Sequence, residues 1–583
     1  MKQKATVQGR SMVFNVLFVI FNLCGLSLVV IGSHAAFQDY FLLFNFLGYI
    51  ILALSAAGIF VFQGRLMIAN VARALVGSLF IVSGLVKAND PIGFAYKLEE
   101  YFEDGALAYR IKELFGMPGF SLEFLVDSAL TLSILICIIE IVLGILVIIG
   151  GKIKLVSYLL ALMMLFFTFL TSHTANCNSK VSFLDRDTYQ TESSIAKIKL
   201  KDSKLNKRIK IVSKTTNEIV VEEWKHPQCV SDCGCFGDAL KGSIGRSLTP
   251  SESLWKDIVL LYLVFWIFIS QRIIIPNTKK QNIKFIIATL LFVSGLSIVF
   301  SWYFPIVFTL ISIVGSLWVR NRGGYFLGNH FGSSLFLIFL SSIFIGYVLL
   351  YAPLKDFSPF AEGKNLIWEM NDGKRGETIN SFVLINKRTG RKETFSEKVY
   401  LSNPKLWEEN NYKFLSKKEK VVNASRLPTI SDQFDPFISV RDLSKNERNL
   451  PFVSIKLRLN PDETTLSFKK EIVREKQVVI LSVQNLKTAR WKNINRIKSL
   501  FNHCKSKDIS FVMITNASKK EIIAFRKANK FDVPVLLNDG TGLKSVSRSN
   551  PALLIIQKGI VKAKFPHRSI PSVDWIKINV LKK

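Results

Sequence analysis

Nine long apolar runs dominate the first 353 residues of this 583-residue chain, and they constrain its fold more than any other feature. A helix that crosses a bilayer needs roughly 20 mostly apolar residues and must satisfy its own backbone hydrogen bonds. The runs are therefore expected to be membrane-spanning helices. They lie at 12–34, 41–62, 67–86, 124–149, 154–173, 256–275, 284–301, 304–319 and 334–352. The seventh and eighth form one stretch, which we divide at Ser301–Pro305 because a proline beside aromatic residues favours an interfacial turn.

Lysine and arginine in the short loops predict the direction of this bundle, because cytoplasmic loops carry an excess of these residues. If the N-terminus lies inside, the cytoplasmic segments contain basic residues, such as Arg65, Lys152 and Arg320, and no acidic residue. The opposite loops are acidic or mixed. We therefore expect a multi-pass protein of the inner (cytoplasmic) membrane with a cytoplasmic N-terminus. The same alternation places residues 174–255 and the chain after residue 353 in the periplasm.

Much of the formal net charge of +32 lies after residue 353. A basic excess of this kind favours an anionic neighbour, such as membrane lipid head groups or a protein partner with an acidic surface. An ordinary solvated surface has the same composition. No nucleic-acid partner is expected, because the chain has no zinc-finger spacing, no RNA-binding signature and no basic helix interleaved with aromatic residues.

The 174–255 segment holds four of the 7 cysteines, which makes it the first place to look for chemistry. Its sequence Asp232-Cys-Gly-Cys-Phe-Gly-Asp238 brings two thiols within one residue of each other. An exported pair meets an oxidising compartment, and the very small ring that it would close is strained and easily reduced. The candidate residues here are the redox pair Cys233 and Cys235, the resolving thiols Cys229 and Cys177, and Asp238 as a binding residue.

Two other interpretations of these cysteines stay open. The four thiols, with His173 and His226 nearby, have the donor types of a metal site. A Cys-x-Cys gap is tighter than structural zinc prefers, however, and no metal is expected. Alternatively, one or two structural disulfides staple the loop and no thiol turns over.

Charged residues also occur where a membrane helix is expected to be apolar. Glu140 lies deep in the fourth run, and Lys87 and Asp90 close the third run in Ser83-Gly-Leu-Val-Lys-Ala-Asn-Asp-Pro91. An intramembrane carboxylate is expensive and by default marks a functional site, although a hydrogen bond to a neighbouring helix also explains it. Lys87 either extends to the interface or pairs with an acidic group. We treat Glu140, Lys87 and Asp90 as candidate binding residues.

Several of these segments together resemble a known family. The run Ser83–Pro91, its continuation Gly93–Tyr101, the pattern Glu140-x3-Gly144 and the motif at 232–238 are similar to the DoxX-like/MauE-like membrane proteins of Bacteroidetes. The likeness extends in order over most of residues 67–583. Further segments that carry it are Leu248-Thr249, Trp255-Lys256-Asp257 and Asp356–Phe360 with Gly363 and Asn365.

The resemblance implies redox or thiol chemistry without naming a substrate. DoxX proteins are associated with terminal oxidases or sulfur metabolism, and MauE proteins with maturing a disulfide-rich periplasmic dehydrogenase. The chain departs from the family pattern in two places. Two extra runs precede residue 67, and a polar, basic insert at 178–228 enlarges the cysteine loop, so that Cys229 lacks an assured counterpart.

After residue 476 the sequence alternates strands and helices in the order that a thioredoxin-like α/β domain has. Pro551 falls where that family has a cis-proline beside its active site. The family's Cys-x-x-Cys is missing, since Gln484–Ala489 holds no thiol. A binding role is therefore expected. The predicted strands are 478–483, 509–515, 533–537, 552–557 and 560–566, and the predicted helices are 489–507 and 518–529.

The predicted fold is a polytopic α-helical membrane bundle of about nine helices joined to a soluble α/β thioredoxin-like domain. The expected parts are two extra helices at 1–66, the DoxX/MauE-like bundle at 67–353 with its cysteine loop, a β-rich segment at 354–475, and the thioredoxin-like domain at 476–583.

The leading hypothesis is an inner-membrane protein that supports periplasmic thiol/disulfide or respiratory redox processes through its Cys-Gly-Cys loop. Under it, a periplasmic or membrane protein is the partner, and the helices either bind a quinone as the redox cofactor or relay electrons. One alternative is a non-enzymatic scaffold or assembly factor whose cysteines are structural. A second alternative is a small-molecule carrier that uses Glu140 and Lys87 in a cavity.

Overall fold

Two compact units, Met1–Lys355 and Asp356–Lys583, make up the chain. The computed structural model describes residues 2–32, 41–61, 64–230, 234, 236, 239–244, 247–322, 330–366, 377–387, 392–396, 406, 411–422, 477–537, 543–544 and 546–581.

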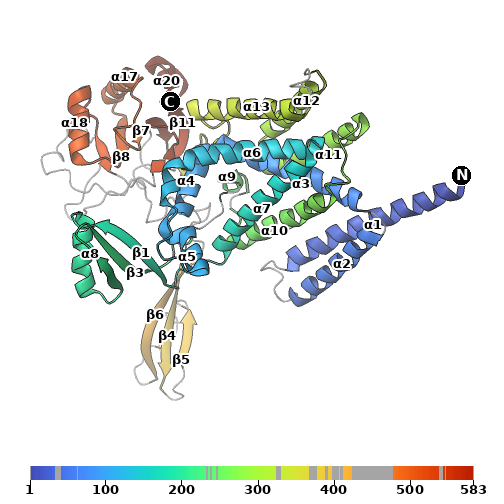
Figure 1. Cartoon of the computed structure of the whole chain (residues 1–583). Helices are drawn as coiled ribbons and strands as arrows, with labels where there is room; N and C mark the ends of the chain where they lie inside the picture. Colours follow the sequence, from blue (N-terminus) through green and yellow to red (C-terminus); the bar gives the residue numbers. More distant parts are fainter. Residues whose placement is uncertain are drawn as a thin grey trace. The chain divides into compact units, whose positions relative to one another are not determined.

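Every apolar run expected to span the membrane is a helix of the first unit (Figure 1). Among the described residues, 8 helices have the length and hydropathy to cross a bilayer, and a shorter apolar helix covers Asn45–Val61. The helices at the nine runs are α1 (Lys2–Gly32), α2 (Phe41–Val61), α3 (Arg65–Asn89), α6 (Ala129–Ile149), α7 (Ile153–Ala175), α10 (Pro250–Ser270), α11 (Lys279–Val299), α12 (Phe304–Arg322) and α13 (His330–Leu350). The predicted helical bundle is confirmed, and the chain is a multi-pass membrane protein.

The long apolar stretch that we divided at Ser301–Pro305 is two helices. α11 ends at Val299, and α12 begins at Phe304. Ser301 has φ 49, which reverses the chain between them. Pro305 is tolerated because the first turn of a helix has no intrahelical partner for its N–H groups.

Short helices fill the connection between α3 and α6. They are α4 (Pro91–Phe102), the π-helix η2 (Asp104–Ala108), α5 (Tyr109–Phe115) and the 3-10 helix η3 (Glu123–Ser128). α4 packs against α6, since the Ser133 hydroxyl of α6 donates to the carbonyl of Pro91 at 2.7 Å. A further short helix, α9 (Ala239–Ile244), follows the cysteine motif.

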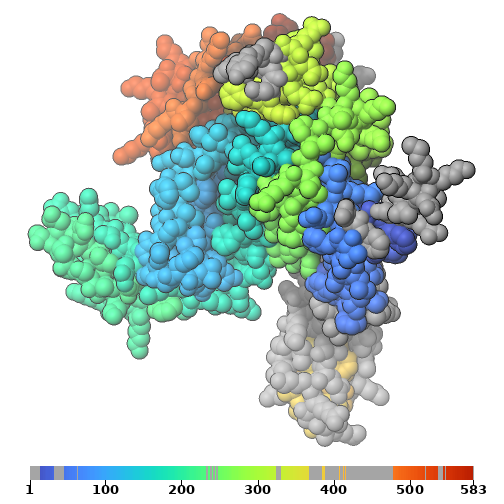
Figure 2. Space-filling view, turned by 45° about the vertical axis from the view of Figure 1, so that its right-hand side comes forward, coloured from blue at the N-terminus to red at the C-terminus, as the bar shows by residue number. Residues whose placement is uncertain are grey.

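The basic insert at 178–228 has a fold of its own, which the sequence did not reveal. Its antiparallel sheet has the order β1-β3-β2, and α8 packs on it. Ala196, Ile209, Ile219 and Val221 form its small apolar core. Its elements are β1 (Phe183–Gln190), α8 (Ser194–Leu205), β2 (Ile209–Lys214) and β3 (Glu218–Lys225). Figure 2 shows the insert as a green lobe beside the blue α4–α5 region.

The second unit contains a mixed five-stranded sheet of order β11-β10-β7-β8-β9. β7, β8 and β9 are parallel, whereas β10 and β11 are antiparallel to their neighbours. Apolar clusters cover both faces of the sheet, which explains why β7 is apolar at every position but one. The elements are β7 (Val478–Val483), α17 (Ile494–Ser506), β8 (Ser510–Thr515), α18 (Lys519–Asn529), β9 (Val535–Leu537), β10 (Ala552–Gln557), β11 (Ile560–Pro566) and α20 (Val573–Asn579).

The expected α/β fold of this region is therefore confirmed, and the strands lie where the alternation predicts them. α17 begins at Ile494 rather than at residue 489. Earlier in the second unit, an antiparallel sheet of order β5-β4-β6 lies within the segment predicted to be β-rich. Its strands are β4 (Glu377–Asn386), β5 (Lys392–Ser396) and β6 (Tyr412–Val422).

Candidate functional site

The α3–α6 interface is unusually close because glycines meet across it. A Cβ atom added at Gly77 would lie 2.8 Å from the carbonyl oxygen of Gly144, and one added at Gly144 would lie 2.9 Å from that of Gly77. A Cβ atom at Gly84 would lie 3.1 Å from the Cβ atom of Glu140. Small residues allow such approach in membrane helices, where packing rather than water drives association. The contact brings residue 87, one turn after Gly84, next to α6.

Lys87 and Glu140, which the sequence marked separately, form a buried ion pair across this interface. Lys87 is 4% exposed and Glu140 is 2% exposed. The Lys87 ammonium also donates to the Ser83 hydroxyl at 3.2 Å and lies 4.6 Å from the ring centroid of Phe167. Among the described residues, the second carboxylate oxygen of Glu140 has no hydrogen-bond partner. Each charge therefore depends on the other for its burial.

Asp90 has a structural task at the end of α3. Its carboxylate accepts a hydrogen bond from the backbone N–H of Gly93 at 2.9 Å and caps α4, with Pro91 at the first helical position. This arrangement satisfies an otherwise unpaired donor at the helix start. The preceding Asn89 exchanges hydrogen bonds with the backbone of Lys355, at 2.7 Å and 3.3 Å.

Towards the opposite end of α3 lies a buried cation, Arg73, which the sequence suggested only as a basic residue of a cytoplasmic segment and not as a site residue. Arg73 is 2% exposed and donates to the carbonyl oxygens of Val147 and Ile148, at 2.9 Å and 3.1 Å. It also donates to the Asn277 side chain at 2.8 Å. A guanidinium there satisfies the last carbonyls of α6 and complements its dipole. The signal was present in the sequence, because Arg73 stands inside an apolar run.

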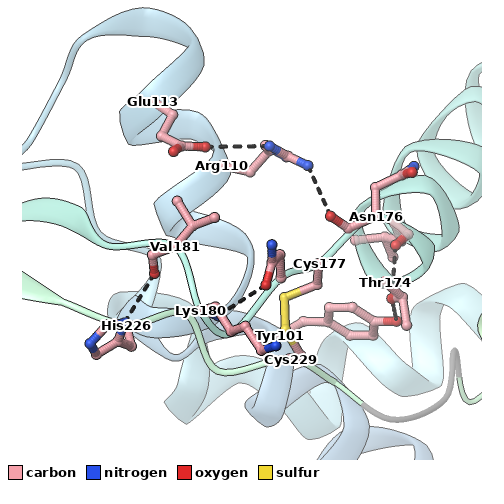
Figure 3. Close-up of a disulfide and its surroundings, with 12 residues drawn as sticks. Tyr101, Arg110, Glu113, Thr174, Asn176, Cys177, Lys180, Val181, His226 and Cys229 are labelled. Carbon is pink, nitrogen blue, oxygen red and sulfur yellow. Dashed lines mark hydrogen bonds and ion pairs between the residues drawn. A yellow bond between two sulfur atoms is a disulfide. The ribbon is translucent and has the colours of Figure 1, made fainter. Parts of the chain in front are cut away.

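The two candidate resolving thiols are joined to each other. Cys177 follows the end of α7, Cys229 follows the insert, and they form a disulfide with a Cα–Cα distance of 5.6 Å (Figure 3). Paired in this way, the two sulfurs are not available together as metal thiolates. Whether either acts as a resolving thiol stays a prediction, since the bond also has the character of the structural staple that was the alternative.

Figure 3 shows how the surroundings hold this disulfide against α4 and α5. Arg110 of α5 donates to the carbonyl oxygen of Asn176 at 3.4 Å. The hydroxyls of Tyr101 and Thr174 lie 2.8 Å apart. On the Cys229 side of the disulfide, the N–H of Gln228 donates to the carbonyl oxygen of Gly105 at 2.7 Å. The base of the insert is therefore fastened on both sides of the sulfur bridge.

The cysteine motif itself is seen through its described neighbours, because Cys233, Cys235 and Asp238 lie outside the described residues. Gly234 is buried with φ +65, and a Cβ atom added there would lie 2.9 Å from Cγ of Lys97. Phe236 is also buried, and its ring centroid lies 5.4 Å from that of Phe300. The motif is thus anchored to the bundle at two points, on α4 and at the end of α11.

A cluster of opposite charges ties the insert to α5. Asp185 of β1 is 1% exposed and pairs with both Lys112 and Lys225. Burial opposes the ionisation of Asp185, but the hydrogen bonds from the two ammonium groups outweigh it and hold the pKa of this carboxyl below its usual value. Asp187 lies 3.2 Å from the Lys225 ammonium and 2.8 Å from the Tyr189 hydroxyl. The acidic groups here already have lysine partners.

In the second unit, the peptide bond between Asn550 and Pro551 is cis, at the start of β10. The Asn550 side chain donates to the carbonyl oxygen of Asn485 at 2.8 Å and to the Thr488 hydroxyl at 3.2 Å. It therefore holds the loop that lacks cysteines against Pro551. Cys504 is fully buried, and burial raises the pKa of its thiol to about 12, which makes it unreactive.

The comparisons with known proteins bear on the first unit. Residues 65–181 match the family described as methylamine utilisation protein MauE. These residues form a MauE family membrane domain. The MauE domain contains Lys87, Asp90, Glu140 and Cys177, and its match ends before the Cys-Gly-Cys motif. No curated protein and no solved structure matches the chain.

Proposed function

We propose that this MauE-domain protein supports thiol–disulfide exchange on the periplasmic side of the inner membrane, with Cys233 and Cys235 as the exchanging pair. The observation that carries the proposal is the Cys177–Cys229 disulfide. It commits two of the four loop cysteines to fastening the insert. The two thiols of the Cys-Gly-Cys motif are left for exchange, beside a bundle to which Gly234 and Phe236 are anchored.

The proposed step is a two-electron exchange. A client dithiol attacks the Cys233–Cys235 disulfide, a mixed disulfide forms, and the second client thiol displaces it. The client becomes a disulfide, and the motif becomes a dithiol that has gained two electrons and two protons. A membrane quinone that accepts the same two electrons and two protons, and becomes a quinol, would restore the motif. A protein of methylamine utilisation, the process in the family description, is the first client to test.

We assign the second unit a client-binding role. Its strand order β8-β7-β10-β11 and the antiparallel pairing of β10 with β7 support a thioredoxin-like domain. It contributes no thiol chemistry in this proposal. Gln484–Ala489 has no cysteine, and Cys504 is buried in the apolar core.

One observation favours the scaffold alternative. The Cys177–Cys229 bond closes the whole insert into a loop with a sequence separation of 52, and such a bond stabilises by restricting the unfolded chain. If the motif cysteines also formed only a structural bond, the protein would assemble complexes rather than exchange disulfides.

The decisive experiment is trapping in native membranes. Cys235→Ser and Cys233→Ser variants of the full chain are alkylated with N-ethylmaleimide after acid quenching, with and without reductant, and analysed by non-reducing electrophoresis and mass spectrometry. We expect one of the two variants to accumulate a mixed disulfide with another protein. Wild-type membranes should show a motif whose oxidation state follows the added oxidised or reduced quinone.

Cys504→Ser is the matched control, because it removes a buried thiol from the core and should trap nothing. If neither motif variant forms a mixed disulfide and the wild-type motif never changes oxidation state, the exchange function is wrong. A loss of protein stability without trapping would instead support the scaffold.

A further inference from the structure

Buried hydroxyl groups gather between α12 and α13, and we propose that they bind the head group of a membrane quinone. This inference rests on the exchange function proposed above, in which a quinone takes two electrons and two protons from the reduced motif. It deepens that function by naming the residues that hold the quinone. Under it, the hydroxyls of Thr309, Ser312 and Ser341 form hydrogen bonds with the oxygens of the quinone and of the quinol.

These three hydroxyls are buried and unpaired. Thr309 and Ser312 on α12 and Ser341 on α13 are each 0% exposed. Among the described residues, none of the three side-chain oxygens has a hydrogen-bond partner. Elsewhere in the bundle a buried hydroxyl donates to its own helix, as Thr171 does to the carbonyl oxygen of Phe167 at 3.0 Å. A buried polar group without a partner costs free energy, so these oxygens are expected to meet a ligand or an ordered water.

Two contacts between α12 and α13 mark the region that holds these hydroxyls. Towards the start of α12, the ring centroids of Phe308 and Phe344 lie 6.0 Å apart. Towards its end, the Ser333 hydroxyl donates to the carbonyl oxygen of Ser316 at 2.9 Å. The start of α12 thus meets the end of α13 and the end of α12 meets the start of α13, so the two helices are antiparallel. The stretch of α12 between the contacts is roughly 12 Å long.

All three hydroxyls come from this stretch. Thr309 follows Phe308 directly, and Ser312 follows it by one turn on the same side of α12. On α13, Ser341 precedes Phe344 by one turn, on the side that contacts α12. In an antiparallel pair, the residues after Phe308 lie level with those before Phe344. Thr309 and Ser341 therefore reach about the same depth from opposite helices.

The surroundings of the hydroxyls suit an uncharged ring with an apolar tail. The buried residues of α12 and α13 include no charged side chain, which favours a neutral ligand over an ion. At one end of the stretch, the ring centroids of Phe304 and Phe344 lie 4.9 Å apart and offer aromatic surface. On the outer sides of the two helices, Ile311 is 50% and Phe339 65% exposed, where the isoprenoid tail of a quinone can lie. Ligand sites between the helices of a bundle combine such apolar walls with a few polar groups.

Aromatic contacts lead from this region to the anchor of the cysteine motif. Phe236 contacts Phe300 at the end of α11, and Trp302 in the following turn stacks on Phe304 with centroids 5.6 Å apart. The hydroxyls therefore follow the end of α12 that is nearest to this anchor. The exchange keeps the direction given above. The motif dithiol loses two S–H bonds and gains one S–S bond, and its two electrons and two protons pass to the two carbonyl oxygens of the quinone.

The test measures quinone binding by the full chain in phosphatidylcholine nanodiscs. A short-chain azidoubiquinone is photolysed, its cross-links are mapped by mass spectrometry, and decylubiquinone competes for the labelling. We expect cross-links in α12 and α13. Thr309→Val, Ser312→Ala and Ser341→Ala should each weaken the apparent binding about fivefold, which corresponds to one hydrogen bond, and the triple variant about a hundredfold.

Thermal unfolding without added quinone separates a binding role from a structural one. The triple variant should unfold at the temperature of the parent or above it, because the hydroxyls that it removes had no partner. Thr171→Val is the matched control. It removes a buried hydroxyl that already has a partner, so quinone binding should equal that of the parent.

Three results would overturn the inference. Cross-links that fall outside α12 and α13, or a triple variant that binds quinone like the parent, would assign the hydroxyls to ordered water. A triple variant that loses stability would make them structural. Photolabelling needs no client, so intact quinone binding with failed trapping of mixed disulfides would count against the exchange function alone.

Discussion

The MauE domain and the insert both bury a lysine–carboxylate contact, yet they support it in opposite ways. Lys87 and Glu140 lie between membrane helices that glycines bring together, with aromatic rings around the ammonium. Asp185 lies at the base of a small sheet, between two lysines, one of which is 34% exposed. In the bundle, close helix packing keeps the Lys87–Glu140 pair together. In the insert, ion pairs and one disulfide fasten the sheet to the neighbouring helices.

The largest expected effect comes from removing one partner of the buried Lys87–Glu140 ion pair. Glu140→Ala leaves the Lys87 ammonium buried without its carboxylate, and we expect a loss of about 3–5 kcal/mol of stability. Thermal unfolding in detergent measures it. The double variant Lys87→Met/Glu140→Leu removes both charges and should regain most of that loss. A single variant as stable as the wild type would contradict the view that the pair depends on mutual compensation.

The same double variant separates function from folding. If it folds normally and still traps mixed disulfides, the pair is a structural contact between α3 and α6. If instead uptake of a small molecule stops while both motif cysteines exchange normally, the carrier alternative applies.

Removing the insert's staple should have the next largest effect. Cys177→Ser opens the disulfide to Cys229, and a loss of about 2–4 kcal/mol is expected. The loss should be confined to residues 178–228, which limited proteolysis of membranes would show as new cuts within the insert and an unchanged bundle. Cys24→Ser is the control. If the bundle unfolds together with the insert, the two regions are not independent in the way proposed.

A glycine substitution tests the packing side of the comparison. Gly84→Ala adds a Cβ atom 2.8 Å from Ile141 and 3.1 Å from Glu140, and such overpacking should lower stability by about 1–3 kcal/mol. Gly295→Ala in α11 is matched to it, because nothing lies within 4 Å of an added Cβ atom there. Thermal unfolding should show no loss for Gly295→Ala. Equal results for both variants would contradict a tight α3–α6 contact.

The smallest effect is a pH dependence of the insert. The pKa of Asp185 is lowered in the folded state, so its stabilisation is present above the unfolded value of about 3.9 and is lost as the pH falls through the folded value. Proteolysis of the insert should therefore increase towards acid pH. Asp185→Asn should be less stable at neutral pH and lose this dependence, whereas the exposed Glu218→Gln should keep it. A wild-type insert that resists protease equally at pH 7 and pH 3 would refute the role of Asp185.

The sequence predicts the helices of the bundle well, because lipid demands long apolar segments and loop composition interrupts them. The alternating pattern after residue 476 likewise predicts the order of β7, α17, β8 and α18. Sequence periodicity did not predict the fold of the insert, where short strands and lysine-rich helix turns bury only a few apolar residues. So little apolar periodicity does not stand out from a polar loop.

The candidate site was likewise predicted only in part from the sequence. Residue types alone marked Lys87, Glu140 and the four loop cysteines, since each is unusual in its position. Lys87 and Glu140 are 53 residues apart, and Cys177 and Cys229 are 52 residues apart. No local sequence rule pairs residues over such distances. Lys97 had attracted no notice as an individual residue, because a lysine within a short helix is ordinary until the fold sets it beside Gly234.

By itself the sequence determined that this is a membrane bundle with an α/β unit after it and its cysteines gathered in one loop, because hydropathy and periodicity are properties of the chain. Only the tertiary structure decided which charges pair and which cysteines are joined. Those outcomes depend on close approach between segments distant along the chain, which α3, α4, α6 and α10 create by packing.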